Sequence, residues 1–241
     1  MPNPTAAMLV IGDEILSGRT RDANMHHLAQ ELVKVGIDLK EVRVVSDDAP
    51  AIVAAVRALS EAFDTVITSG GIGPTHDDIT ADCIAEAFGR SIDVRDDARQ
   101  LLADAYGARG VELTEARLRM ARIPDGAALI DNPVSTAPGF TVENVHVMAG
   151  VPAVFQAMVA SVLPTLTGGT PLLSQSLRVM RPESEIASPL RDLAAEFSDL
   201  SFGSYPFQTD GVYGANVVVR GQDGARLDAA MVKLSEVFPD A

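Results

Sequence analysis

A run of glycines and carboxylates, Gly70-Gly71-Ile72-Gly73-Pro74-Thr75-His76-Asp77-Asp78, is the part of the chain best suited to chemistry. Glycine has no Cβ, so this backbone can approach a ligand closely and can adopt positive φ angles. A helix is expected to begin near Thr80, and the unpaired N–H groups at a helix start favour a bound anion. The run therefore predicts an anion or phosphate site.

Two adjacent carboxylates, Asp77 and Asp78, would repel a phosphate held in that loop unless a divalent cation lay between them. Mg²⁺ in proteins is held by one or two carboxylates together with substrate phosphates. We therefore expect Mg²⁺ or a similar divalent metal (Mn²⁺ or Co²⁺), held by one or both of these carboxylates. The alternative is structural: a tight turn in which Asp77 and Asp78 cap the following helix.

The elements around the loop alternate between strand and helix patterns. Short apolar runs predict strands, and apolar residues at helical spacing predict helices. The expected strands are 7–11, 42–45 and 65–68, and the expected helices are 23–35 and 49–62. This alternation indicates a parallel sheet with right-handed crossovers.

Polar clusters follow each of these strands. Ligands bind beyond the carboxyl ends of parallel strands, so residues placed there belong to one site. Gly12-Asp13-Glu14 follows the first strand, Asp47-Asp48 the second, and the glycine run the third. We therefore expect Asp47, Asp13 and Glu14 to lie near Asp78 and the metal.

The rest of the chain is expected to complete this domain and to add a smaller one. After a helical stretch over 94–121, strands are predicted at 127–130, 140–142 and 145–148, and a helix at 152–166. We place the first domain at 1–167, a Gly/Thr/Pro linker at 168–172, and a β-α-β-β-α module at 173–241. The module's predicted strands are 176–180, 201–206 and 214–220, and its helices are 184–197 and 225–237.

Composition excludes several classes of protein. The 241 residues carry 33 acidic and 19 basic side chains, a net charge of −14, which argues against a nucleic-acid partner. The single cysteine, Cys83, cannot form an intramolecular disulfide. No apolar stretch is long enough for a membrane span, and the amino terminus lacks a signal-peptide pattern. A cytoplasmic location without membrane association is the default expectation.

Several further blocks agree with a known family. Together with the glycine run, the sequence resembles the molybdopterin-binding (MoaB/MogA-like) domain of the CinA-type competence/damage-inducible proteins. The resemblance covers residues 5–167. The blocks that carry it are 70–80 (GGIGPTHDDIT), 12–18 (GDEILSG) with Asp22 and Asn24, 47–48 (DD), 132–140 (NPVSTAPGF) and 150–152 (GVP).

The resemblance implies a three-layer α/β/α fold with a mostly parallel, Rossmann-like sheet, followed here by the small α+β module. It implies a small anionic ligand, either a nucleotide diphosphate or a pterin phosphate such as molybdopterin, and a homo-oligomer. In the CinA-like branch, and in the similar domain attached to eukaryotic FAD synthases, the activity is metal-dependent hydrolysis of ADP-ribose or FAD-like pyrophosphates. CinA proteins often carry a C-terminal deamidase domain, for which this chain of 241 residues has no room.

On this basis we assign candidate roles. The catalytic candidates are Asp47, Asp77 and Asp78, and the metal candidates are Asp78, Asp13 and Glu14. The candidates for contact with the ligand or its phosphates are Gly12, Gly70, Gly71, Gly73, Pro74, Thr75, Thr80, Asn132, Thr136, Ala137, Pro138, Gly139, Gly150 and Pro152.

The chain departs from the family pattern at five positions: Arg117 and Met120 replace the usual Asn and Gln, Ser135 a Gly, Ala149 a Pro, and Val154 a carboxylate. Two alternatives to a hydrolase therefore stay open. One is a molybdenum-cofactor biosynthesis protein that binds or adenylylates molybdopterin, and the other is a non-catalytic binding homologue.

A bulky side chain at Gly71 is a further test of the phosphate site. We expect Gly71→Val to abolish ligand binding and to leave the fold intact, because the branched side chain would fill the space that the phosphate needs.

Overall fold

The computed structural model of the chain describes residues 2–209 and 211–239. It divides into two compact units, residues 1–169 and 170–241. Each unit has its own core of buried apolar side chains, and each is described separately below.

The first unit is built on one six-stranded sheet with the strand order β2-β1-β3-β8-β7-β6. The first four of these pair in parallel, and β7 runs antiparallel to both of its neighbours. The strands are β1 (Thr5–Ile11), β2 (Asp38–Val45), β3 (Thr65–Ser69), β6 (Ala128–Ile130), β7 (Gly139–Val142) and β8 (Val145–Met148). The mostly parallel sheet expected from the sequence is therefore confirmed.

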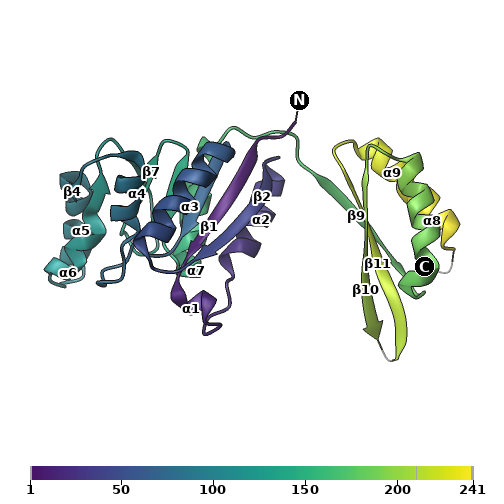
Figure 1. The fold of residues 1–241 in the computed structure, drawn as a ribbon, viewed down its shortest axis with the longest axis horizontal. Coiled ribbons are helices and arrows are strands. Elements are labelled where there is room, and N and C mark those ends of the chain that lie inside the picture. The colour runs from purple at the N-terminus through teal and green to yellow at the C-terminus, as the bar shows by residue number, and fades with distance from the viewer. Residues whose placement is uncertain (1, 210, 240–241) are drawn as a thin grey trace. The chain divides into compact units, whose positions relative to one another are not determined.

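Helices cover both faces of this sheet, because alternate residues of its buried strands point to opposite sides. Ala7 and Leu9 of β1 belong to one core cluster, which includes residues of α3, α4 and α5, whereas Ala6 and Met8 belong to another, which includes residues of α2 and α7. The helices are α1 (Asp13–Leu16), α2 (Asn24–Lys34), α3 (Ala49–Ala62), α4 (Thr80–Phe88), α5 (Asp96–Ala108), α6 (Glu115–Leu118) and α7 (Pro152–Val162). The result is the expected three-layer arrangement (Figure 1).

The single helical stretch expected over 94–121 is wrong. Helix α5 ends at Ala108, the chain turns through Gly110 at a φ of +64°, and only α6 and a 3₁₀ turn, η1 (Arg119–Ala121), follow. Two short strands flank this segment and pair antiparallel, β4 (Ile92–Val94) and β5 (Arg122–Pro124). Three-residue strands show no readable alternation, so the sequence pattern could not reveal a pairing between residues about 30 apart.

A smaller difference concerns the end of α7. The helix stops at Val162, and a 3₁₀ turn, η2 (Leu163–Thr165), replaces its last predicted turn. Pro164 lacks a backbone N–H and so cannot continue the α-helical bonding pattern.

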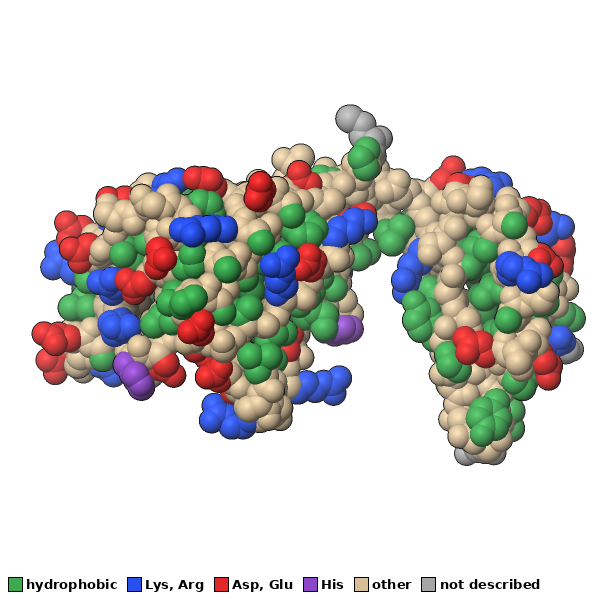
Figure 2. All heavy atoms as spheres, in the orientation of Figure 1, with side chains coloured by type: hydrophobic (Ala, Val, Ile, Leu, Met, Phe, Trp, Pro, Cys, Tyr) green, Lys and Arg blue, Asp and Glu red, His purple; other side chains and the backbone are tan. Residues whose placement is uncertain are grey.

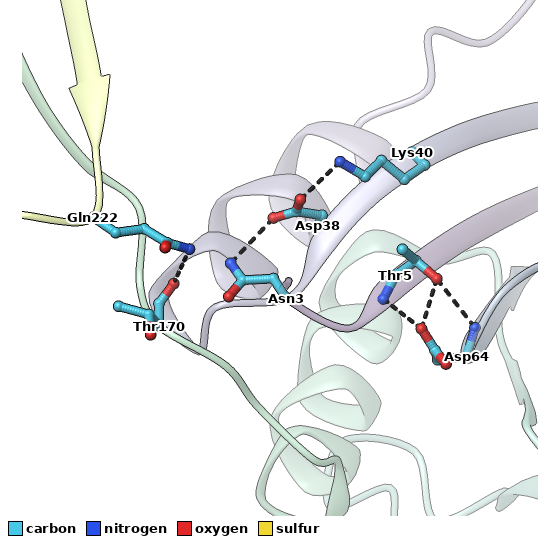
Figure 3. A network of polar contacts seen from close by, with 7 residues as sticks. All are labelled: Asn3, Thr5, Asp38, Lys40, Asp64, Thr170 and Gln222. Carbon is cyan, nitrogen blue, oxygen red and sulfur yellow. Dashed lines mark hydrogen bonds and ion pairs between the residues drawn. The ribbon is translucent and has the colours of Figure 1, made fainter. Parts of the chain in front are cut away.

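The amino end of β1 is tied to both neighbouring strands (Figure 3). Asp64, just before β3, accepts hydrogen bonds from the Thr5 amide (2.8 Å) and hydroxyl (2.7 Å). Asp38, at the start of β2, accepts from the Asn3 side chain (3.2 Å) and from Lys40 (2.7 Å). These contacts support the register that brings the carboxyl ends of β1, β2 and β3 together.

A buried histidine makes the stability of this unit depend on pH. His146 of β8 is 7% exposed, and its Nδ1 lies 2.9 Å from the Thr141 hydroxyl of β7. Burial lowers the pKa of His146 from 6.5 to about 4. The part of the unfolding free energy that depends on neutral His146 is therefore fully present above pH 6.5. It is lost as the pH falls toward 4, because only the unfolded chain takes up the proton in that range.

We expect wild type to lose about 3 kcal/mol of unfolding free energy between pH 6.5 and pH 4 through this group. His146→Gln retains hydrogen-bonding capacity beside Thr141 but does not titrate, so its curve should be flatter by that amount. Denaturant unfolding of both proteins across this pH range measures the difference. Parallel curves for the two proteins would contradict the prediction.

The second unit is a three-stranded antiparallel sheet, in the order β10-β11-β9, with two helices on one side (Figure 1). Val179, Val217 and Val219 of the sheet pack against Ile186 and Leu227 of the helices. Its elements are β9 (Leu173–Val179), α8 (Glu183–Glu196), β10 (Ser201–Thr209), β11 (Val212–Gly221) and α9 (Gly224–Val237). The predicted β-α-β-β-α order is therefore confirmed.

Charged side chains of both signs are distributed over the surface of the first unit, and on the face drawn in Figure 2 the acidic ones are interspersed with Lys and Arg. Over the described ranges, no helix has the length and apolar character needed to span a bilayer.

Candidate functional site

The glycine loop lies directly across the end of β1. β1 and β3 are neighbours in the sheet, and the helices that follow them, α2 and α4, pack on opposite faces, so the two connections diverge here, as they do at ligand sites of open α/β sheets. Gly70 has a φ of +113°, its amide donates to the Met148 carbonyl (3.1 Å), and a Cβ at this position would overlap the Ile11 carbonyl oxygen. Only glycine permits this close approach.

The loop is closed by the first residue of α4. Thr80 is fully buried, its amide donates to the Gly71 carbonyl (3.0 Å), and its hydroxyl donates to the Gly70 carbonyl (3.0 Å). Gly71 has a φ of +69°, and a Cβ there would overlap the Thr80 hydroxyl oxygen. The expectation that Gly71→Val leaves the fold intact is therefore wrong, since the space beside Gly71 belongs to Thr80.

Asp78 turns back toward its own loop. Its Oδ2 accepts hydrogen bonds from the Thr75 amide (2.8 Å) and from the Thr75 hydroxyl. A Cβ at Gly73 would lie 2.6 Å from the same oxygen, so glycine makes room for the carboxylate. The N-cap residue of α4 is Ile79, without a side-chain cap, so the alternative in which Asp77 and Asp78 cap this helix is wrong. Pro74, Thr75 and Asp77 are exposed.

A second group of carboxylates lies at the ends of β1 and β2. Asp47 Oδ2 accepts from the Asp13 amide at the start of α1 (2.9 Å), and Glu14 folds over Gly12, where a Cβ would lie 2.6 Å from its carboxylate. Burial raises the pKa of Asp47, and the negative charges of Asp13, Glu14 and Asp77 raise it further, against that hydrogen bond. Because Asp77 belongs to the glycine loop, the loop and both strand ends share one electrostatic neighbourhood.

The donor set suits a hard cation. Asp47, Asp77 and Asp78 offer only oxygen atoms, which Mg²⁺ and similar ions prefer. Within residues 2–209 and 211–239, no group of three or more His, Cys, Asp or Glu side chains converges into a ready metal site. A cation here would therefore have to complete its coordination with substrate phosphates and water, as Mg²⁺ commonly does.

A hollow lies between the glycine loop and the segment from η1 to β5. We call it the arginine hollow. Among its lining residues are Gly71, Gly73, Asp78, Arg119, Arg122 and Pro138. No sequence motif predicts a role for Arg119 or Arg122. The available signal was that these arginines belong to a basic cluster in an otherwise acidic chain.

A second hollow, the asparagine hollow, lies where β1 and β3 meet the start of α2. Among its lining residues are Glu14, Asn24, Ser69, Gly150 and Pro152. Asn24 is buried, and its Nδ2 donates to the Ser69 hydroxyl and to the Gly150 carbonyl (2.8 Å each). Gly150 and Pro152 are thus gathered here with Glu14, whereas Asp78 and Pro138 border the other hollow.

The 132–139 segment contributes to the arginine hollow mainly through its backbone shape. Buried Asn132 donates from Nδ2 to the Ser135 hydroxyl (2.6 Å) and the Ala137 carbonyl (2.8 Å), and its Oδ1 accepts from the Ser135 amide (3.2 Å). Thr136 has a φ of +70°, and a Cβ at Gly139 of β7 would overlap the Val147 carbonyl oxygen. The side chain of Asn132 is therefore occupied within the loop, and Pro138 is the residue that lines the hollow.

The family departures at Arg117, Ser135 and Val154 line neither hollow. Val154 is buried in the core beside α2, and the guanidinium of Arg117 lies over the Tyr106 ring, 4.9 Å from its centroid. Met120 lines the arginine hollow, and Ser135 accepts a hydrogen bond from Asn132.

Comparison with known families identifies both units. Residues 7–168 match the family described as "Probable molybdopterin binding domain", which covers most of the chain. The chain belongs to this molybdopterin-binding family. Residues 171–241, in the second unit, match the family described as "FAD synthase, middle domain".

Relatives extend over both units. A "Probable FAD synthase" of Caenorhabditis elegans is 32% identical over 97% of this chain, which spans about half (50%) of that longer protein. A protein of Pyrobaculum calidifontis is 33% identical over 98% of this chain and 96% of its own length. The crystal structure of a CinA protein of unknown function from Thermoplasma acidophilum is 34% identical, with a TM-score of 0.62, and covers 67% of this chain and 97% of that one. The molybdopterin-binding domain of this chain is therefore CinA-like as well.

Proposed function

We propose that the molybdopterin-binding domain hydrolyses the pyrophosphate bond of a nucleotide such as ADP-ribose or FAD, with a divalent metal. The observation that carries this proposal is the position of Asp47. It is partly buried, held by the Asp13 amide, and surrounded by the charges of Glu14 and Asp77 beside a glycine loop. Such a concentration of negative charge is expected where a cation and the phosphates of a ligand bind together.

Each part of the site has a task in this reaction. The backbone of Gly71–Gly73 and the start of α4 hold the phosphate that does not react. Asp47, whose pKa is raised, accepts the proton of the attacking water, and its hydrogen bond from the Asp13 amide fixes its direction. Asp77 and Asp78, with Asp13 or Glu14, are the residues that would hold the metal. A bound divalent cation would neutralise the negative charge that develops on the cleaved phosphate.

The relatives support a nucleotide ligand. One of them is named a probable FAD synthase, and FAD contains the pyrophosphate bond that this proposal requires. Since this chain spans half of that protein, the activity of the whole relative is not carried over.

The direct test is incubation of the full chain with ADP-ribose or FAD in the presence of Mg²⁺, Mn²⁺ or Co²⁺. AMP is the expected product from either substrate. If no AMP forms with any of the three metals, the hydrolase proposal is refuted. The chain would then be a non-catalytic binding homologue, an alternative left open by the departures from the family pattern at Met120 and Ser135.

Chelation is expected to weaken nucleotide binding at least tenfold. The chain carries a net charge of −14, and four carboxylates (Asp13, Glu14, Asp47 and Asp77) interact at the site, so an anionic ligand is repelled without a cation. Calorimetric titration with ADP-ribose in Mg²⁺ and in EDTA measures the change. Equal affinity in both buffers would place the ligand away from these carboxylates.

A second candidate function is binding or adenylylation of molybdopterin at the same loop, which the description of the matched family favours. Native mass spectrometry with molybdopterin and with ADP-ribose compares the two ligands in one experiment. A clear preference for the pterin would reverse the order of the two proposals.

A further inference from the structure

The arginine hollow contains two guanidinium groups with different surroundings. Arg122 forms an ion pair with Asp82, which lines the same hollow. Arg119 forms no ion pair with any carboxylate in the part of the chain that the structure describes, while Arg122 is neutralised.

Arg119 is also left with an unused donor. Its Nη2 donates to the Asp78 carbonyl (3.2 Å), but its Nε is buried and has no hydrogen-bond partner among the described residues. A buried charged donor without an acceptor is costly, and the cost is relieved when an oxygen acceptor arrives. A guanidinium presents several N–H groups in one plane, which matches the oxygens of a phosphate.

The backbone that carries Arg119 is held in place on both sides. On one side, the Thr114 hydroxyl accepts from the Arg117 amide at the start of α6 (3.5 Å). On the other, Ala121 is fully buried, and its carbonyl accepts from the Arg95 amide (2.9 Å). η1 therefore presents Arg119 from a fixed position.

One side of the arginine hollow is formed by the glycine loop, and the proposed function places a phosphate at that loop. Gly71 and Gly73 line the hollow together with Arg119, and neither has a side chain that would separate the guanidinium from the loop backbone. A phosphate oxygen placed between them would meet backbone N–H groups on one side and a cation on the other.

We propose that Arg119 binds a phosphate oxygen of the ligand and thereby supplies the positive charge that the carboxylate-rich side of the site lacks. This inference rests on the proposed function, because it requires a phosphate at the glycine loop. It assigns to the arginine hollow the phosphate end of a nucleotide ligand.

The test is calorimetric binding of ADP, with Mg²⁺, to the full chain and to three variants: Arg119→Gln, Arg119→Lys and Arg117→Gln. We expect Arg119→Gln to weaken ADP binding about ten- to a hundredfold, because a charge-assisted hydrogen bond is lost. Arg119→Lys should recover part of the affinity, because it keeps the charge but not the planar fork. Arg117→Gln is the matched control, since that guanidinium stacks on Tyr106 and donates to the Glu112 carbonyl.

Adenosine is the control ligand, because it has no phosphate. Its affinity should be the same in wild type and in Arg119→Gln, and the thermal midpoints of the two proteins should agree. Equal loss of ADP and adenosine binding, or a lowered midpoint in both Arg119 variants, would overturn the proposal in favour of a structural tie to the Asp78 carbonyl.

Failure of this inference and failure of the proposed function give different results. If wild type binds ADP and Arg119→Gln binds it equally well, Arg119 is not a phosphate ligand while the nucleotide site stands. If wild type binds no ADP at all, the proposed function fails, and the assignment of Arg119 fails with it.

Discussion

Asp47→Asn is expected to lower AMP formation about a hundredfold or more while the protein stays folded. The asparagine keeps an oxygen that can accept the Asp13 amide hydrogen, so the local structure should survive. It cannot accept a proton from water, and loss of a positioned general base costs about 10²–10⁴ in rate. Turnover of ADP-ribose at saturating substrate and metal measures the effect.

A matched control separates this role from a simple change in charge. Asp104 on α5 accepts a hydrogen bond from Gln100 and lines neither hollow, so Asp104→Asn should keep full turnover. The affinity of Asp47→Asn for the nucleotide should be unchanged or higher, because one negative charge has been removed. Wild-type turnover in Asp47→Asn would exclude Asp47 as the base.

Gly71→Val is expected to unfold or strongly destabilise the first unit, by about 3 kcal/mol or more. The variant places a branched side chain at a φ of +69° and against the hydroxyl of buried Thr80, the residue whose hydroxyl and amide hydrogen bonds close the loop. For a chain of this size the thermal midpoint should fall by roughly 10 °C. Thermal unfolding of the full chain checks this.

Gly89 provides the control for backbone strain alone. It ends α4 at a φ of +63°, and a Cβ there would meet nothing within 4 Å, so Gly89→Ala should cost only about 1–2 kcal/mol. The further loss of unfolding free energy in Gly71→Val is then due to the overlap of the valine side chain with Thr80. In a double-mutant cycle, Gly71→Ala combined with Thr80→Ala should cost less than the sum of the two single variants. Strict additivity would show that Thr80 is not the obstacle.

The sequence alone was sufficient wherever neighbouring residues decide the structure. The apolar runs at 7–11, 42–45 and 65–68 predicted strands, and the polar residues that follow them, among them Asp13, Glu14 and Asp47, were expected to share one site with the glycine loop. This works because the carboxyl ends of parallel strands meet at one edge, so strand position along the chain implies position in space. The family resemblance on 70–80 rests on equally local residues.

The tertiary structure decided what depends on residues far apart in the chain. Arg119 lies against the glycine loop because β4 and β5 pair and carry η1 with them, a contact that no local periodicity encodes. Position 71 must be glycine because the loop closes on itself, and a side chain there would overlap Thr80, nine positions later. The direction of a side chain relative to a distant wall is fixed only by packing, so the sequence could predict a phosphate loop but not the arginine that faces it.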